Sequence, residues 1–573
     1  MGALDSNLSP NAYQFDNVVA ISYAETNSLW LQRLSRYHGD SMTAYYLVEN
    51  GQSEYYYANF TEDFGDPFAI PHGTPVSDPR IQKLPPNFYA YRATPGISRK
   101  FFQQKMIPNP LWAQTNVFLV RSINKSFELV QLITHSDGSQ EWQHFKQEED
   151  QRPWTAQADT RVKVEQETLD AYWDRLPEFS QQKITSLGKE YFHVRRVSLY
   201  QPDRLTINLP VISGLDKSSP AGEGMYNFFM DYFNFLEFEG LTDLGFVITT
   251  NTLPQPAYST IPSDITAAVA IYQGGSTGQQ YQDLTTVNFE MNTAGCGMRS
   301  VAYFPWNWMD AGDETRIHGV SSIRRDVFLD FLRARHQAEL PNICKAADVY
   351  VKIHCFEASE LKIDFEEADA DDIGPVVGDI QPTGKKVPWR DWTEISYHNF
   401  SNKDSDSSKK WCGPAHFKSD VEMLYTAFSN LMVKDNQIMV TADLTANVDL
   451  NLEGDQAKGD FGRYKQTAIY TMEISDKGQV SVVKKVNPLE DLSGDIDWSD
   501  FNNRKETQQT LQNIQSRLQG YLKGYMKTFE DDLEKYLNSS QGFVFPGGYA
   551  FSFQNLTVSN YGDLVSDILV LSK

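Results

Sequence analysis

Residues 504–538 read RKETQQTLQNIQSRLQGYLKGYMKTFEDDLEKYLN, and the rest of the chain is organised around them. Their apolar side chains recur mostly at steps of three and four, which places them on one face of an α-helix. Asp500 and Asn502 are candidate N-caps. At 1.5 Å per residue this helix is about 50 Å long, so it needs a long partner surface. The apolar residues of this face are Leu511, Ile514, Leu518, Tyr521, Leu522, Tyr525, Met526, Phe529, Leu533, Tyr536 and Leu537.

The residues after this helix predict its partner. Pro546-Gly547-Gly548 is typical of a turn, and Tyr549, Phe551 and Phe553 alternate with small residues as on a strand with one aromatic face. A long amphipathic helix followed by aromatic antiparallel strands predicts an α+β fold. We expect a curved sheet to wrap along the helix, with an apolar seam between them.

Composition excludes several function classes. The chain has 573 residues, with 75 acidic against 51 basic side chains and a net charge of −24, which argues against nucleic acid as a partner. This charge also disfavours broad adsorption to anionic membranes, although a local basic patch remains compatible with it. No apolar run is long enough to span a bilayer, and the first residues lack the core of a signal peptide. Together with only four cysteines, these features predict a reduced, cytoplasmic protein.

The chain divides by composition and periodicity. We expect a flexible tail over residues 1–12, an N-terminal region over 13–385 and a C-terminal region over 386–573, with the boundary in an acidic, irregular stretch. Further predicted elements are a helix over 26–37, a hairpin over 129–145, a helix-prone segment over 157–188, a flexible loop over 404–408, a helix over 420–431, and strands over 437–452, 467–474 and 479–484.

Three short motifs are compatible with chemistry or metal binding, but each has a simpler interpretation. Gly274–Gly278 fits a G-x-S-x-G motif with Ser276 as nucleophile, yet no helical stripe follows, and a glycine-rich turn is favoured. Residues 495–506 space oxygen ligands as a calcium loop does but lack its central glycine, and acids at a helix N-terminus explain them equally well. A zinc site is disfavoured because neighbouring strand residues point to opposite faces. Its candidate ligands are His354, Cys355, Cys412 and His416. We therefore predict no catalytic residue, cofactor or metal.

Two aromatic clusters leave alternatives open. Met225–Leu236 either lines an apolar tunnel, or touches lipid, or is plain core, and core is the favoured interpretation. Phe304–Met309, with two tryptophans, is either an interfacial membrane anchor or a buried corner. Gly2 with Ser6 matches the minimal myristoylation pattern, but no basic cluster follows to supply a second anchoring signal.

Four patches of the chain carry a family resemblance: residues 15–34, 243–262, 317–332 and 543–567. The last patch contains Phe545-Pro546-Gly547-Gly548-x-x-Phe551-x-Phe553 and then Asp563-Leu564-Val565. These patches resemble the TULIP (tubular lipid-binding) superfamily, in particular the accessory proteins of neurotoxin gene clusters. The resemblance implies elongated modules in which highly curved antiparallel sheets wrap around long α-helices and an apolar groove holds a lipid.

The leading functional hypothesis is non-enzymatic binding or transfer of a lipid or another hydrophobic small molecule. One alternative is a protein-interaction component of a toxin or secretion assembly, in which the groove is filled core. An enzyme acting on a hydrophobic small molecule is a minor alternative. Transient membrane contact and protein partners stay open. The predicted groove contacts are Leu518, Tyr525, Phe529, Phe551 and Phe553.

Overall fold

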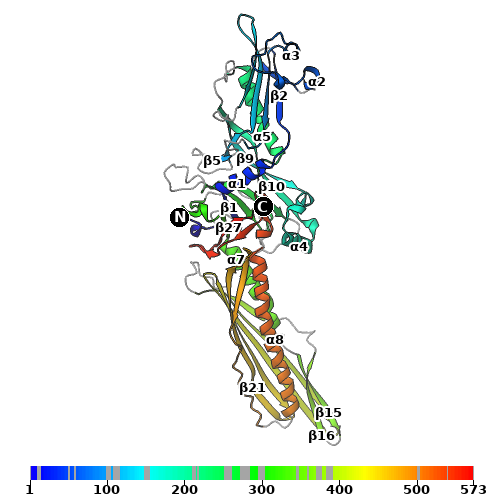
Figure 1. The fold of residues 1–573 in the computed structure, drawn as a ribbon. Helices are drawn as coiled ribbons and strands as arrows, with labels where there is room; N and C mark the ends of the chain where they lie inside the picture. The colour runs from blue at the N-terminus through cyan, green and yellow to red at the C-terminus, as the bar shows by residue number, and fades with distance from the viewer. Residues whose placement is uncertain are drawn as a thin grey trace.

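The chain is drawn out along one axis, and both termini lie near the middle of the molecule (Figure 1). Three regions follow one another along this axis, which we call the upper unit, the central sheet and the lower unit. The residues described in this computed structural model are 2–9, 15–49, 52–56, 60–97, 105–107, 117–147, 155–208, 215, 219–250, 261–270, 284–293, 304–343, 348–357, 360–368, 377–381, 392–499, 504–538 and 540–571.

The upper unit is an antiparallel sheet with a helix packed on it. Helix α5 (Pro220–Phe238) begins at Ser219, whose side chain accepts a hydrogen bond from the Gly222 N–H. Its aromatic face meets the sheet, where the ring of Phe228 lies 5.4 Å from that of Tyr91. The predicted hairpin over 129–145 is confirmed as β7 and β8. The strands, in spatial order, are β3 (Gln52–Tyr56), β2 (Met42–Glu49), β4 (Phe88–Thr94), β7 (Ser126–Thr134) and β8 (Gln140–Lys146), with short helices α2 (Phe60–Phe64), η2 (Pro67–Ala69) and α3 (Pro79–Gln82) beside them.

A second sheet connects the upper unit to the central sheet. Its long strand β9 occupies the first part of the segment that the sequence predicted to be helix-prone, so that prediction is wrong for residues 157–167. Only the later part of the segment is helical. The sheet consists, in spatial order, of β24 (Val544–Pro546), β11 (Asp243–Thr249), β10 (His193–Asn208), β9 (Thr155–Glu167), β6 (Val117–Ile123) and β5 (Lys105–Ile107). The neighbouring helices are η3 (Leu169–Arg175), α4 (Glu178–Leu187), η4 (Lys189–Tyr191) and η7 (Ser540–Gly542).

The central sheet brings together strands from distant parts of the chain. Its antiparallel strands are, in spatial order, β12 (Asp264–Ala270), β13 (Thr286–Asn292), β1 (Asn17–Ser22), β14 (Gly319–Ile323), β27 (Leu564–Val570) and β25 (Phe551–Phe553), with β26 (Thr557–Val558) also paired to β27. Helix α1 (Tyr23–Ser35) follows β1 directly, and η5 (Asp313–Thr315) precedes β14.

The sequence predicted a flexible tail over residues 1–12, but residues 2–9 lie against the central sheet. This segment contains the short helix η1 (Ala3–Asp5). Ser6 and Leu8 are fully buried, and the carboxylate of Asp563 accepts hydrogen bonds from the Ser6 hydroxyl (2.9 Å) and the Leu8 N–H (2.6 Å). A buried carboxylate therefore anchors the start of the chain.

The lower unit is built from long strands and two helices, α7 (Arg325–Ile343) and α8 (Arg504–Leu537). Helix α8 lies where the sequence predicted it, but its candidate N-caps lie outside the described residues. We call the sheet of this unit the long-strand sheet. In spatial order its strands are β17 (Val377–Gln381), β18 (Thr393–Cys412), β19 (Ala415–Lys434), β20 (Gln437–Leu452), β21 (Asp455–Ile474) and β22 (Val480–Val486), and β23 (Glu490–Asp491) also pairs with β21. A separate hairpin consists of β15 (Asp348–Glu357) and β16 (Glu360–Ala368).

Two predictions for this unit are wrong. Residues 404–408 are not a flexible loop but the middle of β18, and residues 420–431 are not a helix but part of β19. The strands predicted over 437–452, 467–474 and 479–484 correspond to β20, the end of β21 and β22.

Elements on both sides of the predicted boundary at residue 385 share structure. Helix α7 precedes that residue and packs against α8 through rings of Phe331 and Tyr536 whose centroids lie 3.9 Å apart. Strands β24 and β27 follow it but pair with β11 and β14. The described chain is therefore of the α+β class, with mostly antiparallel, curled sheets.

Candidate hydrophobic ligand site

The apolar face of α8 is the axis of the candidate site. Its buried residues are Leu511, Ile514, Leu518, Leu522, Tyr525, Met526, Phe529, Leu533, Tyr536 and Leu537. Tyr521, which the sequence placed on the same face, is 37% exposed. The buried residues cover the whole length of the helix, so the apolar seam predicted along it is present.

The partner of this face is the long-strand sheet, and not chiefly the aromatic strands that follow α8. Alternate residues of β19, β20 and β21 are buried along most of each strand, as expected for a sheet with one face turned toward a helix. Tyr470 of β21 illustrates the contact. Its hydroxyl donates to the backbone oxygen of Met526 (2.6 Å), and its ring lies 5.0 Å from that of Phe529.

Polar groups at the C-terminal end of α8 close the edge of this sheet. The N–H groups of Val480 and Val482 on the edge strand β22 donate to Asn538 Oδ1 (2.7 Å) and Glu534 Oε1 (2.6 Å). Lys484 Nζ lies 3.3 Å from Glu530 Oε2. The backbone groups of an unpaired strand edge need hydrogen-bonding partners. At the edge of β22, side chains at the end of α8 supply them.

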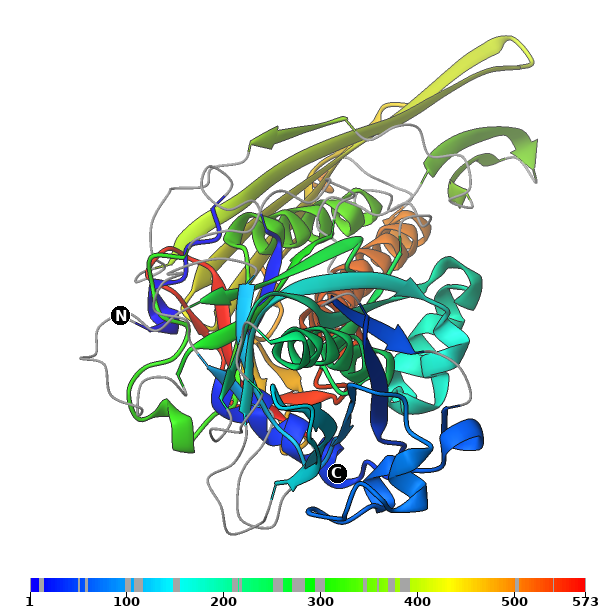
Figure 2. The same ribbon diagram turned by 90° about the horizontal axis from the view of Figure 1, so that it is seen from above.

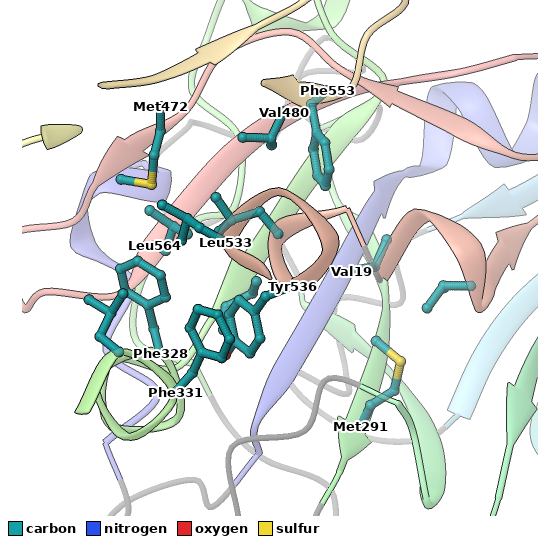
Figure 3. Close-up of a cluster of buried hydrophobic side chains, with 14 of the residues drawn as sticks. Val19, Met291, Phe328, Phe331, Met472, Val480, Leu533, Tyr536, Phe553 and Leu564 are labelled. Carbon is teal, nitrogen blue, oxygen red and sulfur yellow. The ribbon is translucent and has the colours of Figure 1, made fainter. Parts of the chain in front are cut away.

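The interior around α8 is packed. The predicted groove residues Leu518, Tyr525, Phe529, Phe551 and Phe553 are all at most 4% exposed and belong to one continuous apolar core. Figure 3 shows how side chains from α7, α8, β22 and the central sheet fill the space around Tyr536. A small cavity, about 10 Å³, lies where the C-terminal end of α8 meets the central sheet. It is lined by Ser321, Ile323, Val480, Leu537, Phe553, Leu556, Leu564 and Ser566. A volume of that size holds about one water molecule and no acyl chain.

The five predicted residues do not surround one point. Leu518 lies nineteen positions before Leu537 on α8, which corresponds to roughly 28 Å along the helix. Leu537 and Phe553 line the same small cavity, so Leu518 lies far from Phe553. Any ligand that touches all five residues must therefore be elongated and lie parallel to α8.

A buried polar cluster interrupts the apolar interior between α7 and the long-strand sheet. His336 of α7 is fully buried, with Nδ1 2.6 Å from the hydroxyl of Ser396 and Nε2 2.7 Å from that of Ser429. Ser396 also contacts His398 Nε2 (2.8 Å), and the two imidazole rings are 4.6 Å apart. Burial lowers the pKa of His336 well below its usual value, and the nearby His398 lowers it further. Burial also lowers the pKa of His398. Sequence reasoning missed this cluster, because its members are scattered over three elements.

The aromatic clusters left open by the sequence lie in packed structure. In Met225–Leu236, the residues Phe228, Phe229, Tyr232 and Phe233 are buried in the core of the upper unit. The Phe304–Met309 segment is a buried corner: Trp306 and Trp308 are 4% and 1% exposed, so the membrane-anchor alternative is wrong for these tryptophans.

The cysteines differ from the sequence expectation. Cys355 and Cys412 form a disulfide between β15 and the end of β18, whereas the sequence predicted reduced thiols. Both sulfurs of the candidate zinc set are thus bonded to each other, which leaves no thiolate to bind zinc. Within the described part of the chain, no group of three or more potential ligands is placed to hold a metal ion. Ser276 and part of the candidate calcium loop lie outside the described residues.

None of the helices in the described part of the chain has the length and apolar composition needed to cross a bilayer.

Comparisons with known proteins give little beyond this geometry. No protein-family model matches the chain, and no curated protein matches it. Among solved structures, the chain is similar to a crystal structure of lipopolysaccharide binding protein at 10% sequence identity, with 98% of this chain and 99% of that chain covered. The TM-score of this match is 0.28, which is too low to carry an argument about fold or ligand.

Proposed function

We propose that this protein binds or transfers a lipid, or another elongated hydrophobic molecule, in the seam between α8 and the long-strand sheet, without enzymatic chemistry. The observation that carries the proposal is the unbroken apolar face of α8, buried along its length beneath an alternating sheet. The resemblance of the sequence to the TULIP superfamily supports the same function. In this proposal the unit that holds the ligand extends over residues 325–538, because α7 and the long-strand sheet both pack against α8.

The proposal requires the packed interior to expand when a ligand enters. Each CH₂ group moved from water into an apolar interior contributes about 0.8 kcal/mol, so a long acyl chain contributes enough to displace side chains that pack only against one another. The elongated shape of the seam matches an acyl chain better than a compact molecule.

The test is the composition of the purified protein. The protein is prepared without detergent, its intact mass is measured under native conditions, and its organic-solvent extract is analysed by mass spectrometry. We expect a stoichiometric lipid or isoprenoid. Phe529→Ala in the seam is then compared with Phe228→Ala, a matched core variant in the upper unit. Each truncation is expected to destabilise the protein by about 3–5 kcal/mol, so both are checked for folding by circular dichroism.

Loss of ligand from the seam variant but not from the upper-unit variant supports the proposal. Equal ligand content in the wild type and both variants contradicts the assigned location. An extract without ligand from wild-type protein contradicts the function itself.

One observation favours a second candidate function. The five predicted groove residues are at most 4% exposed within one continuous apolar core, as expected if the interior is permanent core and the outer surface binds another protein. We propose that, in this case, the chain is a protein-interaction component of a larger assembly. A bare polypeptide mass together with a stable heteromeric complex in native mass spectrometry is the outcome that selects this function.

A further inference from the structure

The hairpin that joins β18 to β19 carries an exposed aromatic residue in a basic segment. Trp411 is 68% exposed at the end of this hairpin. The sequence from Ser407 to Ser419 contains three lysines and no acidic residue, although the whole chain has a net charge of −24. We call residues 407–418 the hairpin tip. The charge of these residues is therefore opposite to that of the protein as a whole, while the acidic side chains of Asp420 and Glu453 contact Lys418 at the base of the tip.

The hairpin tip projects beyond strand β20. Strands β18 and β19 stay paired as far as Cys412 and Ala415, whereas pairing of β19 with β20 starts only at Ser419. At 3.4 Å per residue, the four residues from 415 to 418 carry the hairpin roughly 14 Å past the last residue of β20 that pairs with β19. Figure 2 shows this yellow-green hairpin reaching away from the body of the molecule. The end of β15 lies beside the tip, because Cys355 is bonded to Cys412, so the tip and this strand end share one end of the molecule (Figure 1).

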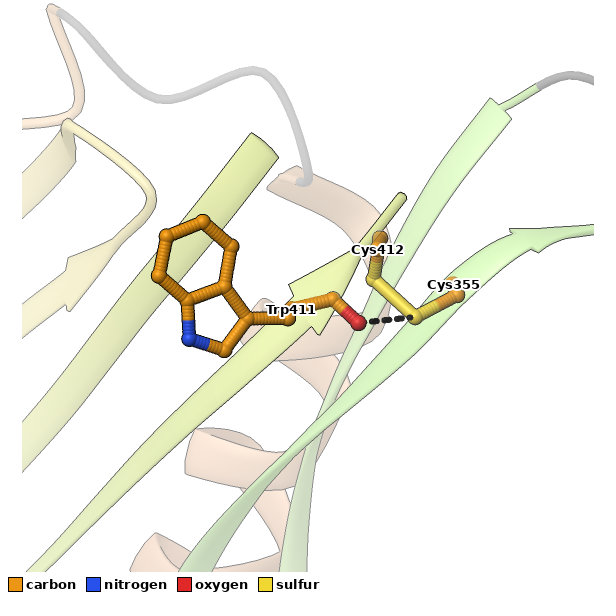
Figure 4. Close-up of a disulfide and its surroundings, with 3 residues drawn as sticks. All are labelled: Cys355, Trp411 and Cys412. Atoms are coloured by element: carbon orange, nitrogen blue, oxygen red, sulfur yellow. Dashed lines mark hydrogen bonds between the residues drawn. A yellow bond between two sulfur atoms is a disulfide. The ribbon is translucent and has the colours of Figure 1, made fainter. Parts of the chain in front are cut away.

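Covalent and aromatic contacts hold the tip in shape. The disulfide joins Cys412 to Cys355 of β15, and the ring of His416 lies 4.7 Å from that of Trp411. The Cys355 sulfur also lies 3.5 Å from the Trp411 carbonyl oxygen, a contact and not a hydrogen bond because a disulfide sulfur carries no proton. Figure 4 shows the indole directed away from the disulfide. The tryptophan is thus presented to the outside by a stapled support.

We propose that the hairpin tip docks the protein end-on to an anionic lipid surface. Tryptophan favours the headgroup layer of a bilayer, because its ring is apolar and its N–H is polar. Lys409 and Lys410 are exposed beside it, where their ammonium groups would face anionic headgroups while their aliphatic stems lie along the interface. Lys418 is also exposed, although it lies 2.9 Å from Asp420. An acidic body is repelled by the same surface, which disfavours side-on adsorption and selects the tip.

This docking does not depend on whether the interior holds a ligand. The proposed function concerns the seam along α8, and a closed interior leaves the tip unchanged. The sequence left open an interfacial anchor or a buried corner at Phe304–Met309; those tryptophans are buried, whereas Trp411 is exposed.

The experiment is cosedimentation of the full chain with vesicles of phosphatidylcholine and phosphatidylserine at roughly four to one, a composition that gives the negative surface potential needed. Vesicles of phosphatidylcholine alone are the lipid control. We expect binding to the anionic vesicles only, and weaker binding as salt is added, because exposed charges are screened.

Two tip variants and one matched surface variant locate the contact. Trp411→Ser and the double variant Lys409→Glu/Lys410→Glu are expected to weaken vesicle binding about tenfold or more. Phe238→Ser removes an aromatic side chain that is 85% exposed on α5 and is expected to bind as the wild type does. All four side chains are exposed, so the melting temperatures should match. Absence of binding by the wild type, equal binding by the tip variants, or an equal loss in the Phe238 variant would overturn the proposal.

Discussion

Acidification is expected to destabilise the lower unit through the pair formed by His336 and His398. The two rings lie 4.6 Å apart, and both nitrogens of His336 contact serine hydroxyls from β18 and β19. The titratable side chains that face His336 are His398 and Tyr525 of α8, whose ring lies 6.5 Å away. Burial lowers the pKa of both histidines, with His398 adding to the shift at His336. Both imidazoles therefore take up a proton less readily in the folded protein than in the unfolded chain.

The sign and size of the effect follow from proton linkage. A histidine in the unfolded chain titrates near pH 6.5. The contribution of the buried pair is present above that pH and is lost as pH falls toward the lowered pKa values of the folded state. Burial lowers the pKa of His336 well below its usual value, so this residue stays neutral while an unfolded histidine is protonated, which costs about 1.4 kcal/mol between about pH 7.5 and 5.5; His398, whose pKa is also lowered, adds to that cost. For a unit of this size, the cost at His336 corresponds to a melting temperature that falls about 3–6 °C further in the wild type than in a variant without the pair.

The assay is the melting temperature at the two pH values for the wild type and for the double variant His336→Gln/His398→Gln. Glutamine keeps hydrogen-bonding groups in place but does not titrate, so the variant should lose most of the pH dependence. His135→Gln, at an exposed site, serves as the control and should behave as the wild type does. If the wild type and the double variant fall by the same amount, the buried pair does not titrate as argued and the reasoning is refuted.

Three further predictions concern the covalent, backbone and terminal contacts. Cys355→Ser/Cys412→Ser removes a disulfide across 57 residues and is expected to cost about 4 kcal/mol in urea unfolding; an unchanged midpoint would contradict it. Gly547→Ala places a Cβ against Leu29 at φ +61°, so a loss of more than about 1 kcal/mol is expected, and a neutral effect would show that the turn adapts. Burial raises the pKa of Asp563 to about 6. The protonated carboxyl therefore stabilises the fold at low pH, by up to about 3 kcal/mol, and this is lost as pH rises through 6. Asp563→Asn should remove that decline in melting curves, and an identical pH profile would count against it.

Sequence periodicity located α8 because a single long element carries its own signal. Ten of the eleven residues assigned to its apolar face are buried, and only Tyr521 is not. Its partner was not predictable in the same way. The aromatic strand at 551–553 follows α8 closely in the chain, yet most of the cover comes from β20, β21 and β22, whose pairing depends on registers that no short segment contains.

The segment 420–431 shows why a strand was mistaken for a helix. Val421, Met423 and Tyr425 point inward with a period of two, but Leu424 on the other face is also apolar and only 37% exposed. Apolar residues on both faces imitate helical spacing over a short window. The disulfide was missed for a different reason, since the connectivity of cysteines cannot be deduced from sequence alone.

For the proposed ligand-binding function, we infer that a ligand enters the seam between β22 and α8. The closure there is held by the hydrogen bonds of Val480 and Val482 to Asn538 and Glu534, besides apolar packing. Such bonds contribute about 1 kcal/mol each, because water replaces the partner when they open. About ten CH₂ groups of an entering chain contribute about 8 kcal/mol on burial. By contrast, separating α7 from α8 breaks the stacked rings of Phe331 and Tyr536 in the interior, where no water compensates. In the proposed function, entry along β22 reconciles the packed interior with an elongated hydrophobic ligand.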